Sequence, residues 1–319
     1  MTTTTYGDIS QRTAAYAATE MLSHADSITV LSKYGLHKPV PKNKAQSVKF
    51  RRAIPFPLAT TPLQEGVTPA GHKMAYEDVP ATLKQYGDFV TITDVVQDEA
   101  EDPVLRDASQ LNGEQAGSTL EAIIWGVLAA GTNVFRAGSV ATRADIDASL
   151  DRGLQRKVTK GLKANKGKHI TSMVGASVKI STEPVAPAFI ALGHTDCESD
   201  IRDMDGFVPV EKYGSMKAMP YEIGKVEDCR YILTPELTPF ASSGKGGKDV
   251  YPIIYLAKEA YGCVPLKGEE SIEPKVLNPN TPRGGDPLGQ RGTVGWKTYF
   301  TAVRLNELWM ARVEVTLGQ

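Results

Sequence analysis

The densest cluster of chemically versatile side chains is His194-Thr195-Asp196-Cys197, which places an imidazole, a carboxylate and a thiol within four residues. A cysteine nucleophile needs a base and an orienting group beside it in space, and these partners normally come from distant segments. Clustering along the chain is therefore weak support for catalysis. We interpret the four residues as a turn that opens a short helix. A cysteine-dependent enzyme is the weaker alternative, and no catalytic residue is assigned.

A second candidate is the loop Gly244-Lys245-Gly246-Gly247-Lys248, whose glycines and lysines are typical of phosphate-binding loops. A true P-loop has the pattern GxxxxGK[ST] between a strand and a helix. Here Asp249, which would repel a phosphate, follows the last lysine, and a strand-like run follows Asp249. We interpret the loop as a flexible, solvated turn and predict no cofactor.

Metal ligation is equally poorly supported. The 5 histidines never pair at helical spacing, and the 3 cysteines lie far apart without a CxxC pattern. Zinc sites require such local pairs, and a disulfide framework requires an even number of cysteines. The sequence therefore predicts no metal site, and a reducing compartment is the simplest setting for its thiols.

Composition narrows the class of protein further. The 319 residues are 41% hydrophobic and 23% charged, which is ordinary for a globular protein. The 36 basic and 37 acidic residues give a net charge of −1, whereas a strongly cationic nucleic-acid binder would carry a basic excess. The polar start of the chain lacks the apolar core of a signal peptide, and the apolar run at 122–130 is too short to cross a bilayer. We expect no contact with a membrane.

Two segments near the start of the chain lack a core of their own. Residues 1–46 contain a short alanine-rich helix candidate and then Pro39-Val40-Pro41, which neither a helix nor a central strand tolerates. We interpret 1–46 as an arm, with a disordered tail as the alternative. Residues 47–97 hold two alternating, extended runs around a long proline-rich connection. We predict a two-stranded arm there, which needs a partner surface because an isolated pair of strands is barely stable.

Helices and strands follow. A continuous helix of about 28 residues, or ~42 Å, is predicted over 103–130. Gly113 and Gly117 weaken its middle, and a kink or break there is the alternative. A second helix is predicted to begin at a cap on Thr142. Short strands are predicted at 188–192, 231–233 and 253–256. The run 294–317 reads as two strands with a break near Asn306, and a helix over 299–310 is the competing interpretation.

Charged residues are segregated along the chain. The second helix and its tail carry seven basic residues, and Asp151 is the only acid beside them. Such runs are usually solvated faces, but complementary blocks on projecting arms can guide one copy of a chain onto the next. We therefore predict a contact between subunits in which a basic block meets an acidic block. The basic block is Lys42, Lys44, Lys49, Arg51 and Arg52, and the acidic block is Asp94, Asp98, Glu99, Glu101 and Asp102.

Five stretches in a fixed order carry a resemblance to a known family. They are Gln64-Glu65-Gly66-Val67-Thr68-Pro69, Leu83-Lys84-Gln85-Tyr86-Gly87, Gly131-Thr132-Asn133-Val134, Glu211-Lys212-Tyr213-Gly214 and the run from Asp286-Pro287-Leu288-Gly289 to Lys297. On these stretches, nearly the whole chain resembles the major capsid proteins of tailed bacteriophages, in the family typified by podophage N-four. His194-Thr195 departs from the His-Pro expected of that family, which affects only a local turn.

The resemblance implies an α+β fold of the Hong Kong 97 type. Residues 1–46 would form the N-terminal arm, 47–97 the extended two-stranded loop and 98–140 the peripheral domain with its long spine helix. Residues 141–290 would form most of the axial α/β domain, and the strands of 291–319 would return to the peripheral domain.

The resemblance also implies a function. Copies of the chain would self-assemble, as pentamers and hexamers, into an icosahedral shell around double-stranded DNA, without binding a particular sequence. Portal and scaffolding or decoration proteins would be further partners. The protein would reside in the virion after assembly in the bacterial host cytoplasm. An encapsulin-like cargo shell of the same fold is the alternative.

Overall fold

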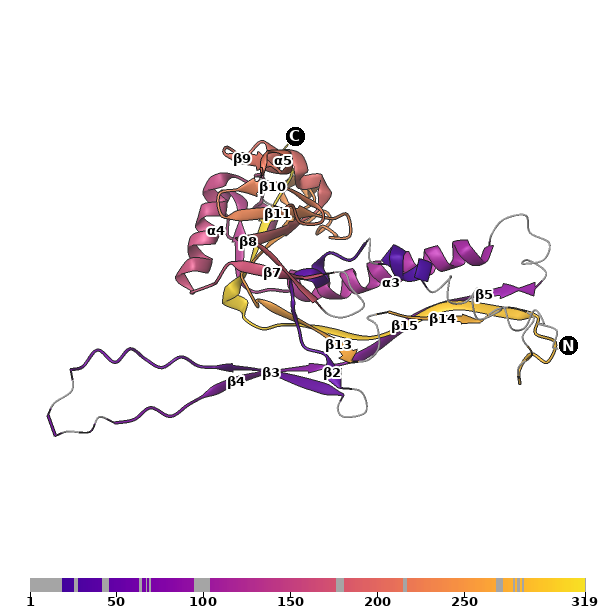
Figure 1. The fold of residues 1–319 in the computed structure, drawn as a ribbon. Coiled ribbons are helices and arrows are strands. Elements are labelled where there is room, and N and C mark those ends of the chain that lie inside the picture. Colours follow the sequence, from indigo (N-terminus) through magenta and orange to yellow (C-terminus); the bar gives the residue numbers. More distant parts are fainter. Residues whose placement is uncertain are drawn as a thin grey trace.

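The computed structural model describes residues 19–25, 28–41, 46–62, 65–66, 68, 70–94, 104–175, 181–214, 217–267, 272–277, 279, 282 and 284–318. The molecule is elongated (Figure 1). A compact body holds most of the short strands, a long helix lies along a set of long strands, and a thin two-stranded arm projects the other way. No helix in these ranges combines the length and the apolar character that crossing a bilayer would need.

The body is built on an eight-stranded mixed sheet whose central strands are buried on both faces. Its order is β6 (Val134–Arg136), β16 (Met310–Val315), β12 (Tyr251–Leu256), β8 (Ser181–Gly193), β11 (Cys229–Leu233), β10 (Glu222–Val226) and β9 (Phe207–Pro209), and β7 (Ile170–Gly175) also pairs with β8. The helix α4 (Arg152–Ala164) packs Leu154, Val158 and Leu162 into the core on one face of this sheet. The short helix α5 (Glu198–Arg202) contributes Ile201 to the same core. The strands predicted at 188–192, 231–233 and 253–256 lie within β8, β11 and β12.

The long helix α3 (Val104–Ala129) packs on a second, six-stranded sheet. That sheet runs β1 (Leu36–His37), β13 (Tyr261–Lys267), β15 (Arg291–Arg304) and β14 (Glu273–Leu277), with β2 (Val40–Pro41) beside β13 and β5 (Lys84–Thr93) beside β15. The apolar stripe that predicts the helix is confirmed, because Leu120, Ile124 and Leu128 are buried in the core that the helix shares with both sheets.

The break that the two glycines left open does not occur in α3, and the glycines have another role. The helix is continuous through Gly113 and Gly117. A Cβ at Gly113 would lie 2.4 Å from the carbonyl oxygen of Met21, and one at Gly117 would lie 2.9 Å from that of Ala25. The glycines therefore let the N-terminal segment cross the helix in direct backbone contact.

The arm consists of β3 (Ser47–Ala53) and β4 (Tyr76–Thr82), paired antiparallel from Ser47 opposite Thr82 to Ala53 opposite Tyr76. The second of the two extended runs of residues 47–97 was predicted to form the other strand of this arm, and that pairing is wrong. That run is β5, which leaves the arm and pairs with β15 from Lys84 to Thr93. Alternation identifies a strand, but it does not identify the strand's partner.

The predicted start of the second helix is also wrong. Thr142 Oγ1 donates to Asp145 at 2.6 Å and only a single 3-10 turn (Arg143–Asp145) follows. The helix α4 begins at Arg152, where the side chain of Asp151 accepts the N–H groups of Gly153 and Leu154. The C-terminal prediction is confirmed, because β15 and β16 are strands separated by a 3-10 turn at Glu307–Trp309, and the competing helix over 299–310 is wrong.

Candidate assembly surfaces

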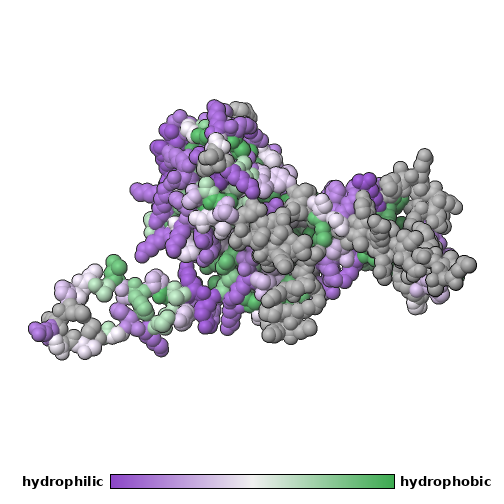
Figure 2. All heavy atoms as spheres, viewed as in Figure 1, coloured by the Kyte–Doolittle hydropathy of each residue, from purple (hydrophilic) through white to green (hydrophobic). Residues whose placement is uncertain are grey.

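The tip of the arm exposes a group of large apolar side chains. Ile54, Phe56 and Leu58 follow β3 along the chain. Met74 precedes β4, and Tyr76 is the first residue of β4. The side chain of each is about half exposed or more, and that of Leu58 is 86% exposed. The arm at the left of Figure 2 accordingly carries green and pale atoms away from the body. Exposed apolar groups that cluster on a projection are typical of a surface that another protein covers.

The base of the arm is fixed to the second sheet. Phe50 of β3 and Ala81 of β4 share a small buried core with Val40 and Val264. Gly262 makes room for the Phe50 ring, since a Cβ there would lie 2.8 Å from it. The direction of the arm is therefore set by packing at its base, while its tip has no such support in the described part of the chain.

Charged residues join the two strands of the arm. Arg51 donates two hydrogen bonds to the carboxylate of Asp78, at 2.8 and 3.0 Å, and Arg52 donates to Glu77. The Arg51 guanidinium hydrogen bonds hold the pKa of Asp78 below its ordinary value. Both pairs are exposed, so they add register and stiffness to the hairpin more than stability.

These pairs bear on the predicted contact between basic and acidic blocks. Arg51 and Arg52, two of its basic members, already have partners on the facing strand of their own arm, which the sequence reasoning missed. The signal was present, because Glu77-Asp78 and Arg51-Arg52 are opposite in charge across the hairpin. Of the other residues, Lys49 and Asp94 are described, whereas Lys42, Lys44, Asp98, Glu99, Glu101 and Asp102 lie outside the described residues.

A buried carboxylate attaches the N-terminal segment to α3. Glu121 is fully buried, and its oxygens accept the backbone N–H groups of Val30 and Leu31, each at 3.0 Å. Tyr261 of β13 donates its hydroxyl to the carbonyl of Leu31, which adds a second attachment of the same turn. Burial raises the pKa of Glu121 to about 7 in spite of the N–H donors. An acid within the apolar stripe of a helix is the sequence signal that could have predicted this attachment.

The histidine, aspartate and cysteine cluster is a structural turn, as predicted. Residues Thr195–Cys197 form a 3-10 turn that leads into α5, and His194 Nδ1 accepts the N–H of Asp196 at 3.1 Å. Cys197 is 1% exposed, and burial raises the pKa of its thiol to about 12. A thiol that is buried and protonated at neutral pH is not a nucleophile.

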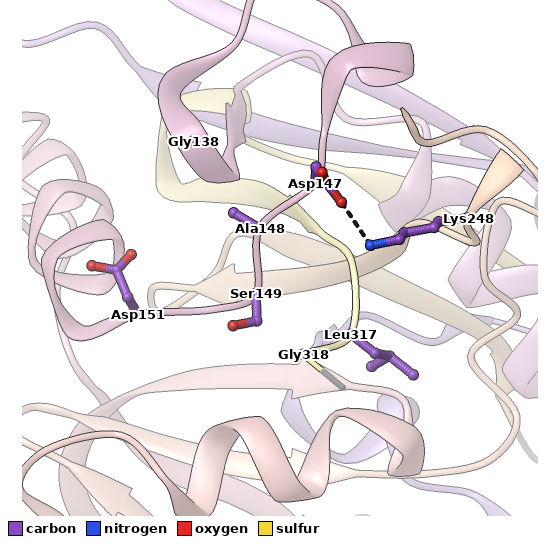
Figure 3. A pocket seen from close by; sticks show the side chains of 8 residues that line it. All are labelled: Gly138, Asp147, Ala148, Ser149, Asp151, Lys248, Leu317 and Gly318. Atoms are coloured by element: carbon purple, nitrogen blue, oxygen red, sulfur yellow. Dashed lines mark hydrogen bonds and ion pairs between the residues drawn. The ribbon is translucent and has the colours of Figure 1, made fainter. Parts of the chain in front are cut away.

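The glycine- and lysine-rich loop borders a surface hollow of about 540 Å³ at the end of the body, lined by Asp147, Ser149, Asp151 and Lys248 among others (Figure 3). Lys248 donates to Asp147 at 2.6 Å and Lys245 to the same carboxylate at 3.2 Å, which lowers the pKa of Asp147. The carboxylate of Asp151 caps α4. The charged groups of the hollow thus satisfy one another or the backbone. Within the described ranges, no group of three potential metal ligands converges.

Comparison with known proteins gives a consistent result. A family model described as "Phage capsid protein" matches residues 76–313. The capsid of Ralstonia phage GP4 has a TM-score of 0.67 at 10% identity, covering 91% of this chain and 89% of that one. The head of Helicobacter pylori bacteriophage KHP40 has a TM-score of 0.60 at 11% identity, covering 92% and 90%.

A third solved structure comes from a different kind of particle. The holo-SrpI encapsulin complex from Synechococcus elongatus PCC 7942 has a TM-score of 0.53 at 11% identity, covering 89% of this chain and 86% of that one. At such low identity these likenesses concern the fold. No curated protein sequence matches the chain.

Proposed function

The chain belongs to the phage capsid protein family, and we propose that its copies assemble into an icosahedral shell around the double-stranded DNA of a tailed bacteriophage. The predicted fold of the Hong Kong 97 type is confirmed by the capsid structures that the chain matches over about nine-tenths of its length. The podophage N-four-like subfamily stays a prediction. So do the five domain boundaries, apart from the strand pairing corrected above.

The observation that carries the proposal is the arm. A pair of strands with exposed apolar side chains at its tip gains little from folding alone, and burial of apolar area is the main source of association free energy. At roughly 25 cal/mol per Å² of buried apolar area, a few such side chains per contact are enough to favour assembly when the contact repeats at each subunit.

The remaining elements of the proposal concern partners and place. Pentamers and hexamers of this chain would form the shell, and a portal and scaffolding or decoration proteins would complete the particle. The protein would reside in the virion after assembly in the bacterial host cytoplasm, and it would act as a structural protein without enzymatic activity. The buried thiol of Cys197 argues against the cysteine-dependent alternative.

The charge contact between subunits also stays a proposal. Because Arg51 and Arg52 are already paired inside the arm, Lys49 and the residues outside the described ranges would carry the basic side of it. Asp94 and the acidic residues that follow would carry the other side. Raising the salt concentration would then slow assembly before it affects folding, since the Debye length falls from about 10 Å at 0.1 M to about 3 Å at 1 M.

An encapsulin-like cargo shell is the second candidate, supported by the likeness to the SrpI encapsulin complex. The two candidates share a closed shell and differ in its contents. Nuclease-resistant DNA inside particles from the native source would favour the phage capsid, and an enclosed protein cargo would favour the alternative.

Shortening the arm tests the proposal. The N–H of Ile54 donates to the carbonyl of Ala75 at 2.9 Å, so residues 55–74 can be replaced by Asn-Gly, which forms a two-residue hairpin turn. We expect a variant with an unchanged melting temperature that forms no shells in electron micrographs. Leu58→Asp should have the same effect and Leu58→Met, the matched control, should assemble normally. Normal shells from the shortened arm would contradict the proposal.

A further inference from the structure

The outward face of α4 and of the turn after it is strongly basic. Residues 152–168 include seven lysines and arginines and no acid: Arg152, Arg156, Lys157, Lys160, Lys163, Lys166 and Lys168. The opposite face of the helix is apolar and packs on the sheet. α4 lies at the left edge of the body in Figure 1, where the surface in Figure 2 is almost uniformly hydrophilic.

Three of the seven cations are neutralised within the chain. Arg152 lies 2.7 Å from Asp205, and Arg156 and Lys163 pair with Glu227 and Asp228, the two residues of the turn between β10 and β11. The pKa of Glu227 and of Asp228 is lowered mainly by these hydrogen bonds.

The other four cations have no carboxylate within ion-pair distance in the part of the chain that the structure describes. Lys157, Lys160, Lys166 and Lys168 remain after the three pairs are formed, and Lys157 reaches only the hydroxyl of Ser139 at 3.5 Å. The whole chain has a net charge of −1, so these four positive charges are a local excess, and the rest of the chain carries a net negative charge.

The composition of this face distinguishes between classes of partner. Protein interfaces are organised around buried aromatic and aliphatic anchors, and lysine is depleted in them. From 152 to 168 no large apolar side chain is exposed, in contrast to the tip of the arm. Lysines without an apolar anchor fit a phosphate backbone, which is bound through charge and is read without regard to sequence.

We propose that this face of α4 contacts the phosphate backbone of the packaged DNA and therefore lines the interior of the shell. The inference rests on the proposed function. The 13-residue helix is about 20 Å long, and duplex DNA carries a charge about every 1.7 Å along its axis, so several phosphates lie within reach. Four unpaired lysines per subunit give a weak contact that salt weakens further, which suits DNA that must enter and leave.

Lysine acylation followed by mass spectrometry tests the location of the face. Shells filled with DNA, shells emptied of DNA and free subunits are treated with a small reagent that passes through the shell. We expect Lys157, Lys160 and Lys168 to be labelled several-fold less in filled shells than in emptied ones. The control residues Lys245 and Lys248, which pair with Asp147, should be labelled equally in both.

Two outcomes would overturn the inference while leaving the proposed function intact. Equal labelling of the α4 lysines in filled and emptied shells would show that DNA does not cover them. Protection that persists in emptied shells would show that a neighbouring subunit or another protein covers them. Failure of the chain to form shells at all would instead contradict the proposed function.

Direct binding is the second test. The variant Lys157→Gln/Lys160→Gln/Lys168→Gln keeps Lys166, whose φ of 59° makes the backbone there sensitive to change. Fluorescence anisotropy with a labelled 30-base-pair duplex should show at least tenfold weaker binding by the purified subunit at 50 mM salt. The slope of log K against log salt should become shallower by about 2.7. Unchanged affinity and slope, or an equal loss in Lys245→Gln/Lys248→Gln, would overturn the proposal.

Discussion

At the scale of single residues, the buried Glu121 makes the stability of the folded protein depend on pH. Its pKa is about 7 in the folded protein against an ordinary value of 4.5, because burial disfavours the charged form. Between these two pH values the folded protein keeps a proton that the unfolded chain has released. The free energy of unfolding therefore falls as pH rises through this window.

The Glu121→Gln variant is expected to remove this pH dependence. Below pH 4.5 the free energy of unfolding of the wild type is about 3 kcal/mol larger than at high pH. This difference is lost as the pH rises through about 7. Urea unfolding measured from pH 4.5 to 8 should show the fall in the wild type and in the exposed control Glu211→Gln, and a flatter profile in Glu121→Gln. Parallel profiles for all three proteins would contradict this account of Glu121.

The ion pair between Arg51 and Asp78 makes a separate prediction at the same scale. Arg51→Asp places two carboxylates opposite each other on β3 and β4 and should lower the yield of shells. Adding Asp78→Arg to the same chain restores a pair of opposite sign and should restore the yield, measured by sedimentation. If the yield recovers only when Glu99 and Glu101 are changed to Lys, Arg51 serves the contact between subunits instead of the arm.

At the scale of elements, the crossing of α3 by the N-terminal segment depends on glycine. Alanine favours helices more than glycine does, but at position 113 its Cβ would collide with the carbonyl of Met21. Gly113→Ala should therefore destabilise the protein by about 1–3 kcal/mol, the usual cost of overpacking. Gly126→Ala on the same helix is the matched control. With no atom within 4 Å of its Cβ, it should stabilise by about 0.5–1 kcal/mol. Thermal unfolding of both variants checks the prediction, and equal effects would contradict it.

The sequence predicts most elements and few of their partners. The stripe from Leu120 to Leu128 identifies α3, and the break near Asn306 is visible from two separate runs of alternation. The start of α4 was misplaced because Thr142 and Asp145 bond to each other, whereas Asp151 makes the actual cap. The pairing of β5 with β15 joins residues some 200 positions apart, and no local pattern encodes such a contact.

The assembly surfaces show the same difference between features that the sequence predicts and contacts that it does not predict. The prolines and glycines between residues 53 and 76 predict a projecting segment. The apolar residues within that segment, such as Phe56 and Leu58, indicate that its tip is apolar. The attachment by Glu121 depends on donors 90 residues away, so the sequence predicts at most that a buried acid needs partners. Ion pairing on α4 likewise depends on Glu227 and Asp228, which only folding brings beside the helix.

At the scale of the whole molecule, the shape follows from an uneven distribution of apolar residues. The body and the long helix bury large apolar cores, one of which they share, whereas the arm has a core only at its base and exposes apolar residues at its tip. Figure 1 shows the consequence, a subunit with a thin projection that its own body does not cover. Under the proposed function, a second copy of the chain is the partner that covers this projection.

Cryo-electron microscopy of the purified, assembled protein tests this account of the molecule. We expect closed icosahedral shells in which the tip of each arm, from Ile54 to Tyr76, lies on an adjacent subunit with Phe56, Leu58 and Met74 buried. A stable small oligomer of folded subunits, or closed shells in which the arm tips remain exposed to solvent, would contradict it.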